Sequence, residues 1–362
     1  MTNPTPTTQS FDEKKAEAFA EQLLDTLNSG AIAVMTSIGH RTGLFDTLAK
    51  LPPATSQEIA DAAGLQERYV REWLGAMVTG KFVNYSPVNQ TYHLPPEHAA
   101  FLTRDASPDN IATFSQYVSL LGSVEDQIIN CFYNGGGVPY SEFKRFHQVM
   151  AEDSGQTVVA ALMEHVLPLV PGLIADLELG IEVMDLGCGS GRALNKMAKL
   201  FPKSRFNGYD LSEDAIATAQ KEAQAQGLTN IQFQARDAVT LDQVEQYDLI
   251  TTFDAIHDQA KPDVVLKNIH RALRAEGTYL MQDIRAASDV GGNLEHPVGP
   301  LLYTISCMHC MTVSLAAGGM GLGAMWGEEK ALEMLEVAGF KQVEIKQLDH
   351  DFQNNFYIVK KN

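Results

Sequence analysis

The sequence predicts an α/β fold with a mostly parallel sheet in the second half of the chain, preceded by a mainly helical domain. From Ile181 onward, strand-like and helix-like segments alternate, and a glycine-rich turn joins the first of these strands to its helix. Strands that alternate with helices form a parallel sheet covered on both faces. The first hundred residues instead show apolar residues at helical spacing.

Length and charge limit the possible functions. The chain has 362 residues, which at roughly 150 residues per domain predicts two domains. Hydrophobic residues make up 45% and charged residues 20%, an ordinary composition for a globular protein. The formal net charge of -18 repels polyanions, so we expect no nucleic-acid partner.

Cysteine content and hydropathy bear on the compartment. Four cysteines are too few for a disulfide scaffold, so we expect reduced thiols and a cytoplasmic protein. The N-terminal residues show no basic region followed by an apolar core, and no uncharged apolar run of about 20 residues occurs. We therefore expect neither a signal peptide nor a membrane span.

The first domain is predicted to cover residues 1–108 and to begin with helices over 13–28 and 31–51. The apolar stripe on the second of these helices exceeds what one small domain buries, which predicts a homodimer formed through the N-terminal helices. Its members are Ile32, Val34, Met35, Ile38 and Leu44.

A helix-turn-helix pattern follows. Thr55 and Glu58 form a capping box that opens a helix ending at Gly64, and a second helix spans 66–79. The apolar residues of the second helix recur at helical spacing and are predicted to be core: Tyr69, Val70, Trp73, Leu74, Met77 and Val78. The stretch 81–94 is typical of two short strands around a turn, which completes a winged-helix pattern. Residues 109–176 are helical and are interpreted as a connector.

The second domain is predicted to span residues 177–362. Its five parallel strands are expected over 181–187, 204–211, 230–237, 247–254 and 277–284. Residues 284–326 interrupt the alternation with an apolar, methionine-rich insertion that can form a lid over the strand ends. The last two strands, 342–348 and 354–361, can pair as an antiparallel edge.

The turn after the first strand reads Asp185-Leu186-Gly187-Cys188-Gly189-Ser190-Gly191. Glycines let a ligand approach the backbone closely, and the following helix presents free N–H groups at its start. Dinucleotide-binding folds use a similar turn, but their fingerprint requires glycine or alanine where this chain has Arg192.

Two more aspartates follow neighbouring strands. Asp210 lies nineteen residues after Gly191, where a carboxylate can accept hydrogen bonds from both ribose hydroxyls, and Asp237 can accept from an adenine amino group. Ligands bind at the carboxyl ends of strands in open α/β sheets. The three aspartates together therefore predict a nucleoside site.

These motifs, with the step Arg236-Asp237-Ala238 and the strand YDLITTFDAIHD, resemble class I S-adenosylmethionine-dependent methyltransferases. The resemblance covers roughly residues 177–362 and implies a Rossmann-like sheet with one antiparallel strand. It implies S-adenosyl-L-methionine as the cofactor and a small, partly apolar methyl acceptor. The implied contacts follow chain order: Asp185, Gly187, Gly189 and Gly191 for the methionine part, Asp210 and Leu211 for the ribose, Asp237 and Ala238 for the adenine, Phe253 and Asp254 for the sulfonium side.

The catalytic residues are less strongly indicated. Methylation of a hydroxyl or an amine needs a base, and His257, beside Asp258 after the fourth strand, suits that task. His309 in the insertion is the alternative base. Cys307, His309 and Cys310 are too close in the chain to wrap around one ion, so we expect no metal.

Two other functions compete with an enzyme. The N-terminal half is similar to the winged-helix domain that precedes small-molecule methyltransferase domains, but transcription factors share the pattern. A regulator that binds DNA should carry a basic face, whereas the second helix pairs Arg68 and Arg71 with Glu67 and Glu72. An NAD-dependent oxidoreductase is disfavoured by Arg192 and by the closing antiparallel strand. The acceptor atom, oxygen, nitrogen or sulfur, stays open.

Overall fold

The computed structural model describes residues 11–361 and separates the chain into two compact units, which divide after Ser119. The segment 109–176, which the sequence predicts to be a connector, is therefore shared between the units rather than forming a part of its own. Each unit is described by itself.

The N-terminal unit is mainly helical. Its elements are α1 (Glu13–Thr42), α2 (Leu44–Lys50), α3 (Ser56–Ala63), α4 (Glu67–Thr79), β1 (Asn84–Ser86), β2 (Thr91–His93) and α5 (Pro96–Leu102). The two short strands pair antiparallel after the α3–α4 pair, as the winged-helix pattern predicts. The predicted helix break near residue 30 is wrong, because α1 continues through Gly30 and ends at Gly43. Gly43 has φ 73° and its N–H reaches two carbonyls of the last turn, so this glycine supplies the left-handed cap.

The capping box of α3 is confirmed, since the Thr55 side chain accepts the Glu58 backbone N–H and the Glu58 carboxylate accepts the Thr55 backbone N–H. The α4 face that carries Val70, Trp73, Leu74 and Met77 is buried, as predicted, and anchors the core of this unit. Tyr69 is an exception, with 81% of its surface exposed. It lies on the first turn of α4, outside the arc that the core covers.

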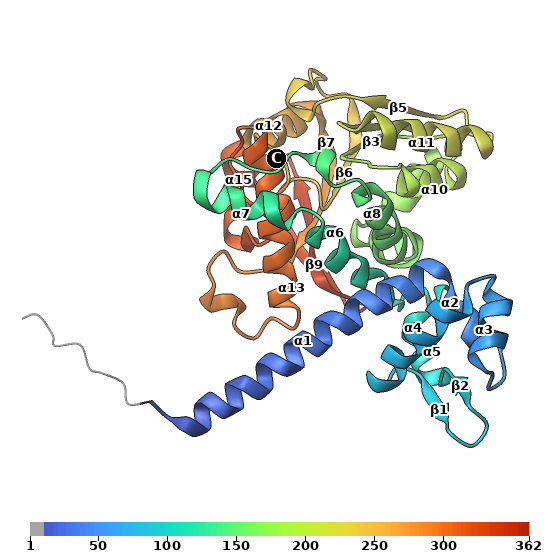
Figure 1. The fold of residues 1–362 in the computed structure, drawn as a ribbon. Coiled ribbons are helices and arrows are strands. Elements are labelled where there is room, and N and C mark those ends of the chain that lie inside the picture. The colour runs from blue at the N-terminus through green and yellow to red at the C-terminus, as the bar shows by residue number, and fades with distance from the viewer. Residues whose placement is uncertain (1–10, 362) are drawn as a thin grey trace, which may run out of the picture. The chain divides into compact units, whose positions relative to one another are not determined.

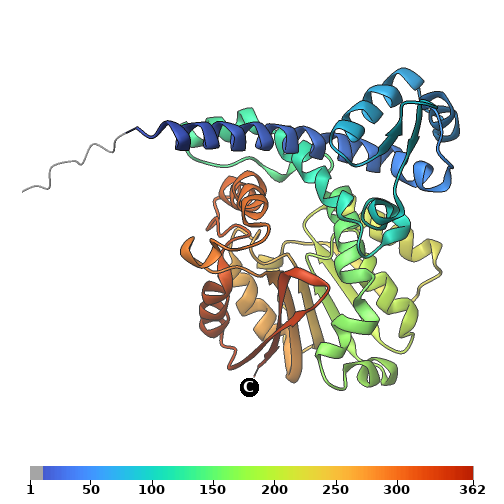
Figure 2. The same ribbon diagram turned by 90° about the horizontal axis from the view of Figure 1, so that it is seen from below.

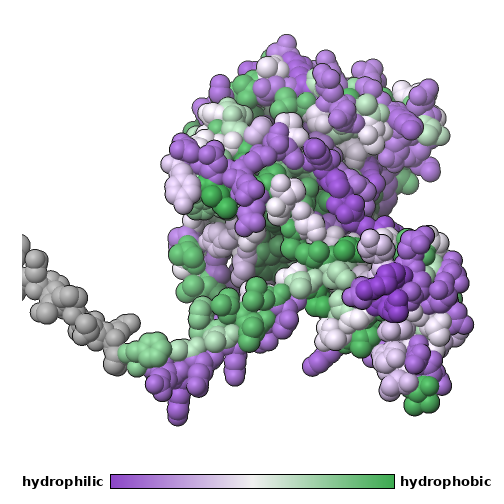
Figure 3. All heavy atoms as spheres, in the orientation of Figure 1, coloured by the Kyte–Doolittle hydropathy of each residue, from purple (hydrophilic) through white to green (hydrophobic). Residues whose placement is uncertain are grey.

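Most of the apolar stripe predicted as a dimer surface packs within the N-terminal unit itself. Leu44 is buried, and Ile32 and Met35 pack against the core of the N-terminal unit, which leaves Val34 and Ile38 partly exposed. The more exposed apolar residues of α1 lie earlier in the helix, and we call them the α1 apolar face: Phe19, Leu23, Leu24 and Leu27. Figure 3 shows apolar residues along the length of α1.

The C-terminal unit contains a seven-stranded sheet with the order β5-β4-β3-β6-β7-β9-β8 (Figures 1 and 2). Its strands are β3 (Glu182–Leu186), β4 (Arg205–Asp210), β5 (Ile231–Ala235), β6 (Tyr247–Phe253), β7 (Leu273–Ile284), β8 (Gln342–Leu348) and β9 (Asp351–Lys360). β3 to β7 pair in parallel, and β9 is antiparallel to both β7 and β8. The mostly parallel sheet with one antiparallel strand is confirmed.

Helices cover both faces of this sheet, because successive strand residues point to opposite sides. On one face Val183 and Leu249 pack with α10 (Arg192–Leu200) and α11 (Glu213–Ala225). On the other face Met184 and Ile250 pack with α12 (Pro262–Ala272) and α15 (Gly327–Ala338). Because β3, β4, β5 and β6 run parallel, their carboxyl ends lie at one edge of the sheet, where the candidate site is found.

Two further groups of helices complete this unit. Before the sheet come α6 (Gln116–Gly122), which begins just before the division, α7 (Glu125–Asn134), α8 (Phe146–Ser154), π-helical turns at Gly155–Val159 and Leu162–Val166, and α9 (Leu173–Leu179). The insertion contains α13 (Gly299–Ile305), a π-helical turn at Ser306–Cys310 and α14 (Met311–Ala316). Across residues 11–361 we find no helix that is both apolar enough and long enough to cross a membrane.

Candidate active site

The glycine turn between β3 and α10 has three left-handed residues with different surroundings. Gly187, Gly189 and Gly191 have φ values of 74°, 52° and 69°. A Cβ on Gly187 would lie 2.4 Å from Ala255, and one on Gly191 would lie 2.6 Å from Phe233. A Cβ on Gly189 would meet nothing within 4 Å. Packing thus requires the outer glycines, whereas the middle one faces open space.

A cavity extends over this turn and is closed on its other side by α8. The turn and the start of α10 line it through Asp185, Gly187, Cys188, Gly189, Ser190, Arg192 and Ala193, joined by Phe253 from β6. The segment around α8 supplies His147, Met150, Ala151, Ser154 and Val158. A chain segment without a recognisable motif therefore forms one wall of the cavity.

Two cations hold this wall in place. Arg192 Nη1 donates to the carbonyl of Ala151 at 2.6 Å, and Lys196 Nζ donates to the carbonyl of Val159. Arg192, which separates this turn from the dinucleotide fingerprint, thus ties α10 to α8. The sequence did not predict that α8 residues line the cavity. Their only trace in the sequence is the pair of cations on α10 that bond to the α8 segment.

Asp185 lies on the floor of the cavity at the end of β3. Its side chain is buried, and Thr251 Oγ1 donates to Asp185 Oδ1 at 2.7 Å. Burial raises the pKa of Asp185 to about 7, and the hydrogen bond from Thr251 only partly opposes this. A cationic group bound in the cavity would stabilise the ionised form of this carboxyl group.

Asp210 organises the glycine turn. Its Oδ2 accepts the Gly189 N–H at 2.8 Å, and its Oδ1 accepts the Ser212 N–H at 2.8 Å. A carboxylate has about four acceptor positions, so Asp210 retains capacity for ligand hydroxyls. The neighbouring Leu211 is 74% exposed.

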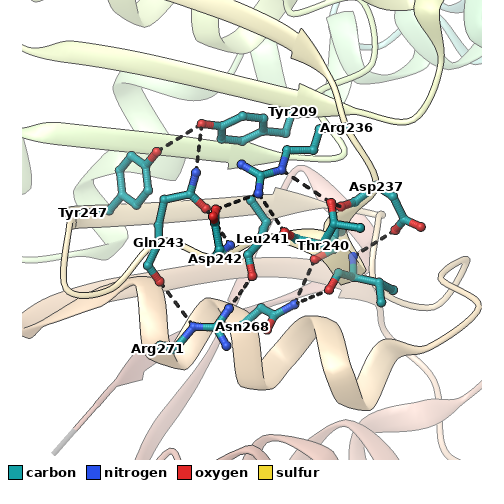
Figure 4. A network of polar contacts seen from close by, with 12 residues as sticks. Tyr209, Arg236, Asp237, Thr240, Leu241, Asp242, Gln243, Tyr247, Asn268 and Arg271 are labelled. Atoms are coloured by element: carbon teal, nitrogen blue, oxygen red, sulfur yellow. Dashed lines mark hydrogen bonds and ion pairs between the residues drawn. The ribbon is translucent and has the colours of Figure 1, made fainter.

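Asp237 lies after β5 on a loop fixed by hydrogen bonds (Figure 4). Its Oδ1 accepts the Val239 N–H at 2.9 Å, and the carboxylate is exposed. Arg236 Nη2 donates to Thr240 O and Asp242 Oδ1, both at 2.7 Å. Asn268 of α12 donates to the carbonyl oxygens of Ala238, which is buried, and Val239. The loop is thus held from two sides, and it presents the exposed carboxylate of Asp237 to solvent.

Beyond Phe253 the chain leaves β6 with a strained residue. Asp254 has φ 50°, a region that costs a non-glycine residue of order 1 kcal/mol and recurs at functional sites. Its Oδ2 accepts a hydrogen bond from Gln282 Nε2 at 2.9 Å. Burial and the neighbouring Asp283 raise the pKa of Asp254 well above its usual range. Phe253 borders the cavity, whereas the carboxyl group of Asp254 is directed to Gln282.

His257 lies between two carboxylates and is buried. Its Nδ1 is 2.7 Å from Asp283 Oδ1, and its Nε2 is 3.3 Å from Asp258 Oδ1. Asp283 Oδ1 also accepts from Trp326 Nε1 at 2.9 Å. Burial alone would lower the pKa of His257, but Asp283 and Asp258 outweigh it and raise the pKa well above its ordinary value. The two carboxylates therefore favour the doubly protonated form of this imidazole.

His309 lies nearby in a different state. The π-helical turn at Ser306–Cys310 turns both His309 and Cys310 inward, and such turns recur at functional sites. The His309 ring stacks on Phe146 at 3.6 Å and 5°, and its Nδ1 is 3.9 Å from Asp258 Oδ2. Burial lowers the pKa of His309 to about 4, so the ring is neutral.

Ligand-type atoms of His257, Asp258 and Cys310 lie within 4.8 Å of one another. The sequence had grouped Cys307, His309 and Cys310 instead, and the structure pairs Cys310 with residues from another element. All four cysteines are free thiols. Burial raises the pKa of Cys310 to about 12, which keeps its sulfur protonated.

Comparison with known proteins agrees with this geometry. Residues 177–339 match the family described as "Methyltransferase domain", and residues 30–104 match "Rv2258c-like winged HTH domain". The chain thus carries a winged-helix domain followed by a methyltransferase domain, and the mostly parallel sheet of the second domain has the one antiparallel strand expected of class I S-adenosylmethionine-dependent methyltransferases.

Among curated relatives, a malonyl-[acyl-carrier protein] O-methyltransferase of Bacillus cereus is 28% identical over 151 residues, which is 41% of this chain and 49% of that protein. A fatty-acid O-methyltransferase of Mycolicibacterium smegmatis is 30% identical over 116 residues, 32% of this chain and 41% of that protein. The chain therefore spans about half or less of the length of these relatives.

Among solved structures, human N-acetylserotonin methyltransferase in complex with S-adenosylmethionine superposes with a TM-score of 0.65. It is 18% identical, and the match covers 99% of this chain and 100% of that one. PigF with S-adenosylhomocysteine gives a TM-score of 0.68 at 20% identity, over 94% of this chain and 99% of that one. These likenesses show that the fold extends over nearly the whole chain.

Proposed function

We propose that this protein transfers the methyl group of S-adenosylmethionine to oxygen, nitrogen or sulfur of a small, partly apolar molecule. The observation that supports this most strongly is the open space at Gly189, bordered by Asp185 and Asp210 from the ends of adjacent strands. A cofactor with an amino acid part and a nucleoside part needs this combination of a backbone cradle and spaced carboxylates.

The residues of the glycine turn suit each part of that cofactor. Asp185 and the turn would hold the methionine part, Asp210 the ribose and Asp237 with Ala238 the adenine, while Phe253 would lie toward the sulfonium group. When bound, S-adenosylmethionine supplies a methyl group on a positively charged sulfur. Bonds from Ser212, Val239 and Gly189 fix the aspartates before any ligand enters, so little rearrangement is needed.

Proton removal from the acceptor is assigned to His257, with His309 as the alternative. Asp283 and Trp326 fix the His257 ring so that Nε2 is directed away from Asp283 and toward Asp258. His257 must lose the proton on Nε2 before it acts as a base, so turnover should rise with pH through its raised pKa. His309 is already neutral, so if it were the base, turnover would not rise with pH near neutrality.

An apolar part of the acceptor would contact aromatic side chains. Tyr140, Phe143 and Phe146 surround the His309 ring, with centroid distances of 5.2, 4.7 and 3.6 Å. The insertion 284–326, which carries His309 and its own apolar cluster, is proposed as the lid over this end.

We infer that the winged helix does not read DNA. Arg68 and Arg71 of α4 pair with Glu72 at 2.5 Å and with Glu67 at 3.3 Å, so both cations are neutralised within the helix. Micromolar binding to duplex DNA at physiological salt would contradict this.

A homodimer is proposed through the α1 apolar face. Four large apolar side chains that are 50–64% exposed on one helix favour association with a second copy. The free thiols support a reducing compartment, which we propose to be the cytoplasm. Light scattering should give a dimer for the wild type and a monomer for Leu24→Glu with Leu27→Glu, while Glu17→Gln should stay dimeric.

Transfer itself can be tested without knowing the acceptor. Protein incubated with methyl-labelled S-adenosylmethionine and a low-molecular-weight metabolite extract should move label into an organic-extractable product. Crystals soaked with S-adenosylhomocysteine and the same extract would identify the acceptor beside the sulfur. Label that stays in the cofactor with every extract, despite cofactor binding, would contradict the proposed reaction.

A further inference from the structure

The end of the site around His257 has more hydrogen-bond acceptors than donors. Within the described part of the chain, several buried side-chain atoms here have no hydrogen-bond partner: Asp254 Oδ1, Asp258 Oδ1, Gln282 Oε1, Asp283 Oδ2 and both ring nitrogens of His309. Four of these six atoms are oxygens: the amide oxygen of Gln282 always accepts, and the three carboxyl oxygens accept when they are ionised. We call the side chains of these five residues with His257 the acceptor-end cluster.

Three donors of this region bond to the same carboxylate oxygen, and His257 Nε2 lies 3.3 Å from Asp258 Oδ1. Asp283 Oδ1 accepts from His257 Nδ1, Trp326 Nε1 and the Ile284 N–H, at 2.7, 2.9 and 2.8 Å, while Asp283 Oδ2 accepts none. Buried polar atoms are nearly always satisfied, and an unsatisfied one costs about 1–3 kcal/mol. The cluster therefore favours a bound group that donates hydrogen bonds.

The charges around the cluster also favour a hydrogen-bond donor over an anion. The ionisable groups that act on Asp254 are Asp283, His257, Asp153 and Asp351. Those that act on His257 are Asp283, Asp258 and Cys310, with no lysine or arginine in either set. An anionic group entering here would meet several carboxylates and a single imidazolium that is already paired.

His309 supplies an independent observation. Unlike the carboxyl groups of the cluster, this side chain is an imidazole, and it is fully buried. Its Nδ1 lies 3.9 Å from Asp258 Oδ2, which is too far for a hydrogen bond between the two atoms. One donor placed beside both atoms could bond to each. The flat ring stack of His309 on Phe146 lies next to this position and suits an aromatic or aliphatic body.

We infer that the acceptor-end cluster recognises an amine or a hydroxyl group, neutral or cationic, and discriminates against a carboxylate acceptor. The inference rests on the proposed methyl transfer and narrows its substrate class. A carboxylate would add a negative charge and no donor, so it would leave every one of these oxygens unpaired. An amine or hydroxyl group brings one to three donors to the same place.

Three matched probes test this. 2-Phenylethylamine, 2-phenylethanol and phenylacetate share a phenyl ring and differ in the polar group. Calorimetric titration into protein saturated with S-adenosylhomocysteine should give dissociation constants at least about 10-fold lower for the amine and the alcohol than for phenylacetate, a difference of about 1.4 kcal/mol. Phenylacetate binding as tightly as the amine, or no measurable binding of the amine, would overturn the inference.

Variants sharpen the test. Asp258→Asn removes one charge from the cluster at constant shape and should reduce the advantage of the amine over phenylacetate about 10-fold. Asp263→Asn, on the first turn of α12, is the matched control and should leave the ranking unchanged. An unchanged ranking in folded Asp258→Asn, verified by its melting curve, contradicts the inference. If that variant does not fold, the wild-type ranking still decides.

Two measurements separate this inference from its alternatives. Titration of S-adenosylhomocysteine alone tests the proposed function, and the probe titrations are repeated on ligand-free protein so that they decide the acceptor chemistry in either case. Elemental analysis of the purified protein addresses a metal ion. A stoichiometric ion lost in Cys310→Ser would satisfy the same oxygens without an amine or hydroxyl and would overturn the inference.

Discussion

The cofactor end and the acceptor end of this active site are assembled in different ways. At the cofactor end, Asp185 and the three glycines lie within seven residues, and Asp210 bonds directly to the middle glycine. At the acceptor end, the contacts join α8, the segment after β6, the end of β7, the π-helical turn of the insertion and Trp326. The first end depends on backbone geometry, the second on the balance of buried charges.

Because of this difference, the two ends should tolerate different substitutions. A glycine turn fails when a single Cβ is added in the wrong place, since the backbone itself forms the site. A charge cluster keeps its backbone when one side chain is neutralised, but the pKa values of its neighbours change. Substitutions at the two ends should therefore affect different measurements.

The largest effect is expected at the acceptor end. His257→Ala should lower turnover by roughly 10²–10⁴-fold and leave the affinity for S-adenosylhomocysteine within about two-fold. The variant should also lose the rise of the rate with pH that the wild type shows. Steady-state rates across pH, together with calorimetry, measure both quantities.

His165→Ala removes an exposed histidine from the same unit and serves as the control. If His257→Ala retains wild-type turnover while His309→Ala loses it, the base has been assigned to the wrong histidine. Wild-type turnover in both variants would leave positioning alone as the source of catalysis.

At the cofactor end, two glycine substitutions should separate stability from binding. Gly191→Ala should destabilise the protein by about 2–5 kcal/mol, because the new Cβ would lie 2.6 Å from Phe233 at φ 69°. Gly189→Ala has room and should cost only about 1 kcal/mol, but its methyl group projects into open space, where we propose the cofactor lies. Chemical denaturation and calorimetry measure the two effects. Equal stability of the two variants would contradict the assignment.

The same contrast explains how much of the molecule the sequence predicted. The sheet, its antiparallel closing strand and the aspartates at the strand ends follow from local patterns, since strand alternation and the glycine turn are each contained in a few residues. The roles of Tyr140, Phe146 and Met150 could not be predicted, because they depend on how α8 folds back over β3. The position of the helix break at Gly43 rather than Gly30 was missed for a related reason, since only tertiary packing decides which glycine ends a helix.

A smaller effect concerns pH and the cofactor end. Burial raises the pKa of Asp185 to about 7, whereas an unfolded aspartate has a pKa of about 3.9. Between these values the folded chain holds a proton that the unfolded chain has lost, so stability should fall as pH rises and should level off above about pH 7. The ideal slope is about 1.4 kcal/mol per pH unit, which sets an upper limit.

Asp185→Asn keeps the hydrogen bond to Thr251 but cannot titrate, so it removes this slope. The difference in melting temperature between the variant and the ligand-free wild type should therefore widen from pH 5 to pH 7. A constant difference across that range would mean that Asp185 does not hold a proton in the folded protein.

The smallest effect tests the wall that α8 forms. Arg192→Met should weaken S-adenosylhomocysteine binding about 2- to 10-fold, because α8 loses its hydrogen bond to α10 at Ala151. Lys199→Met, exposed on the same helix, should leave affinity unchanged. Equal affinity of Arg192→Met and wild type would mean that α8 keeps its position over the cavity without this bond.

The most direct test of the central claim is the affinity of Asp210→Ala for S-adenosylhomocysteine. Asp210 both orders the glycine turn through the Gly189 N–H and is assigned to the ribose hydroxyls. Calorimetry on the wild type should show one site per chain, and the variant should bind more weakly by about 1–3 kcal/mol. Binding unchanged within error in a variant with a wild-type melting curve would place the cofactor elsewhere and contradict the proposed site.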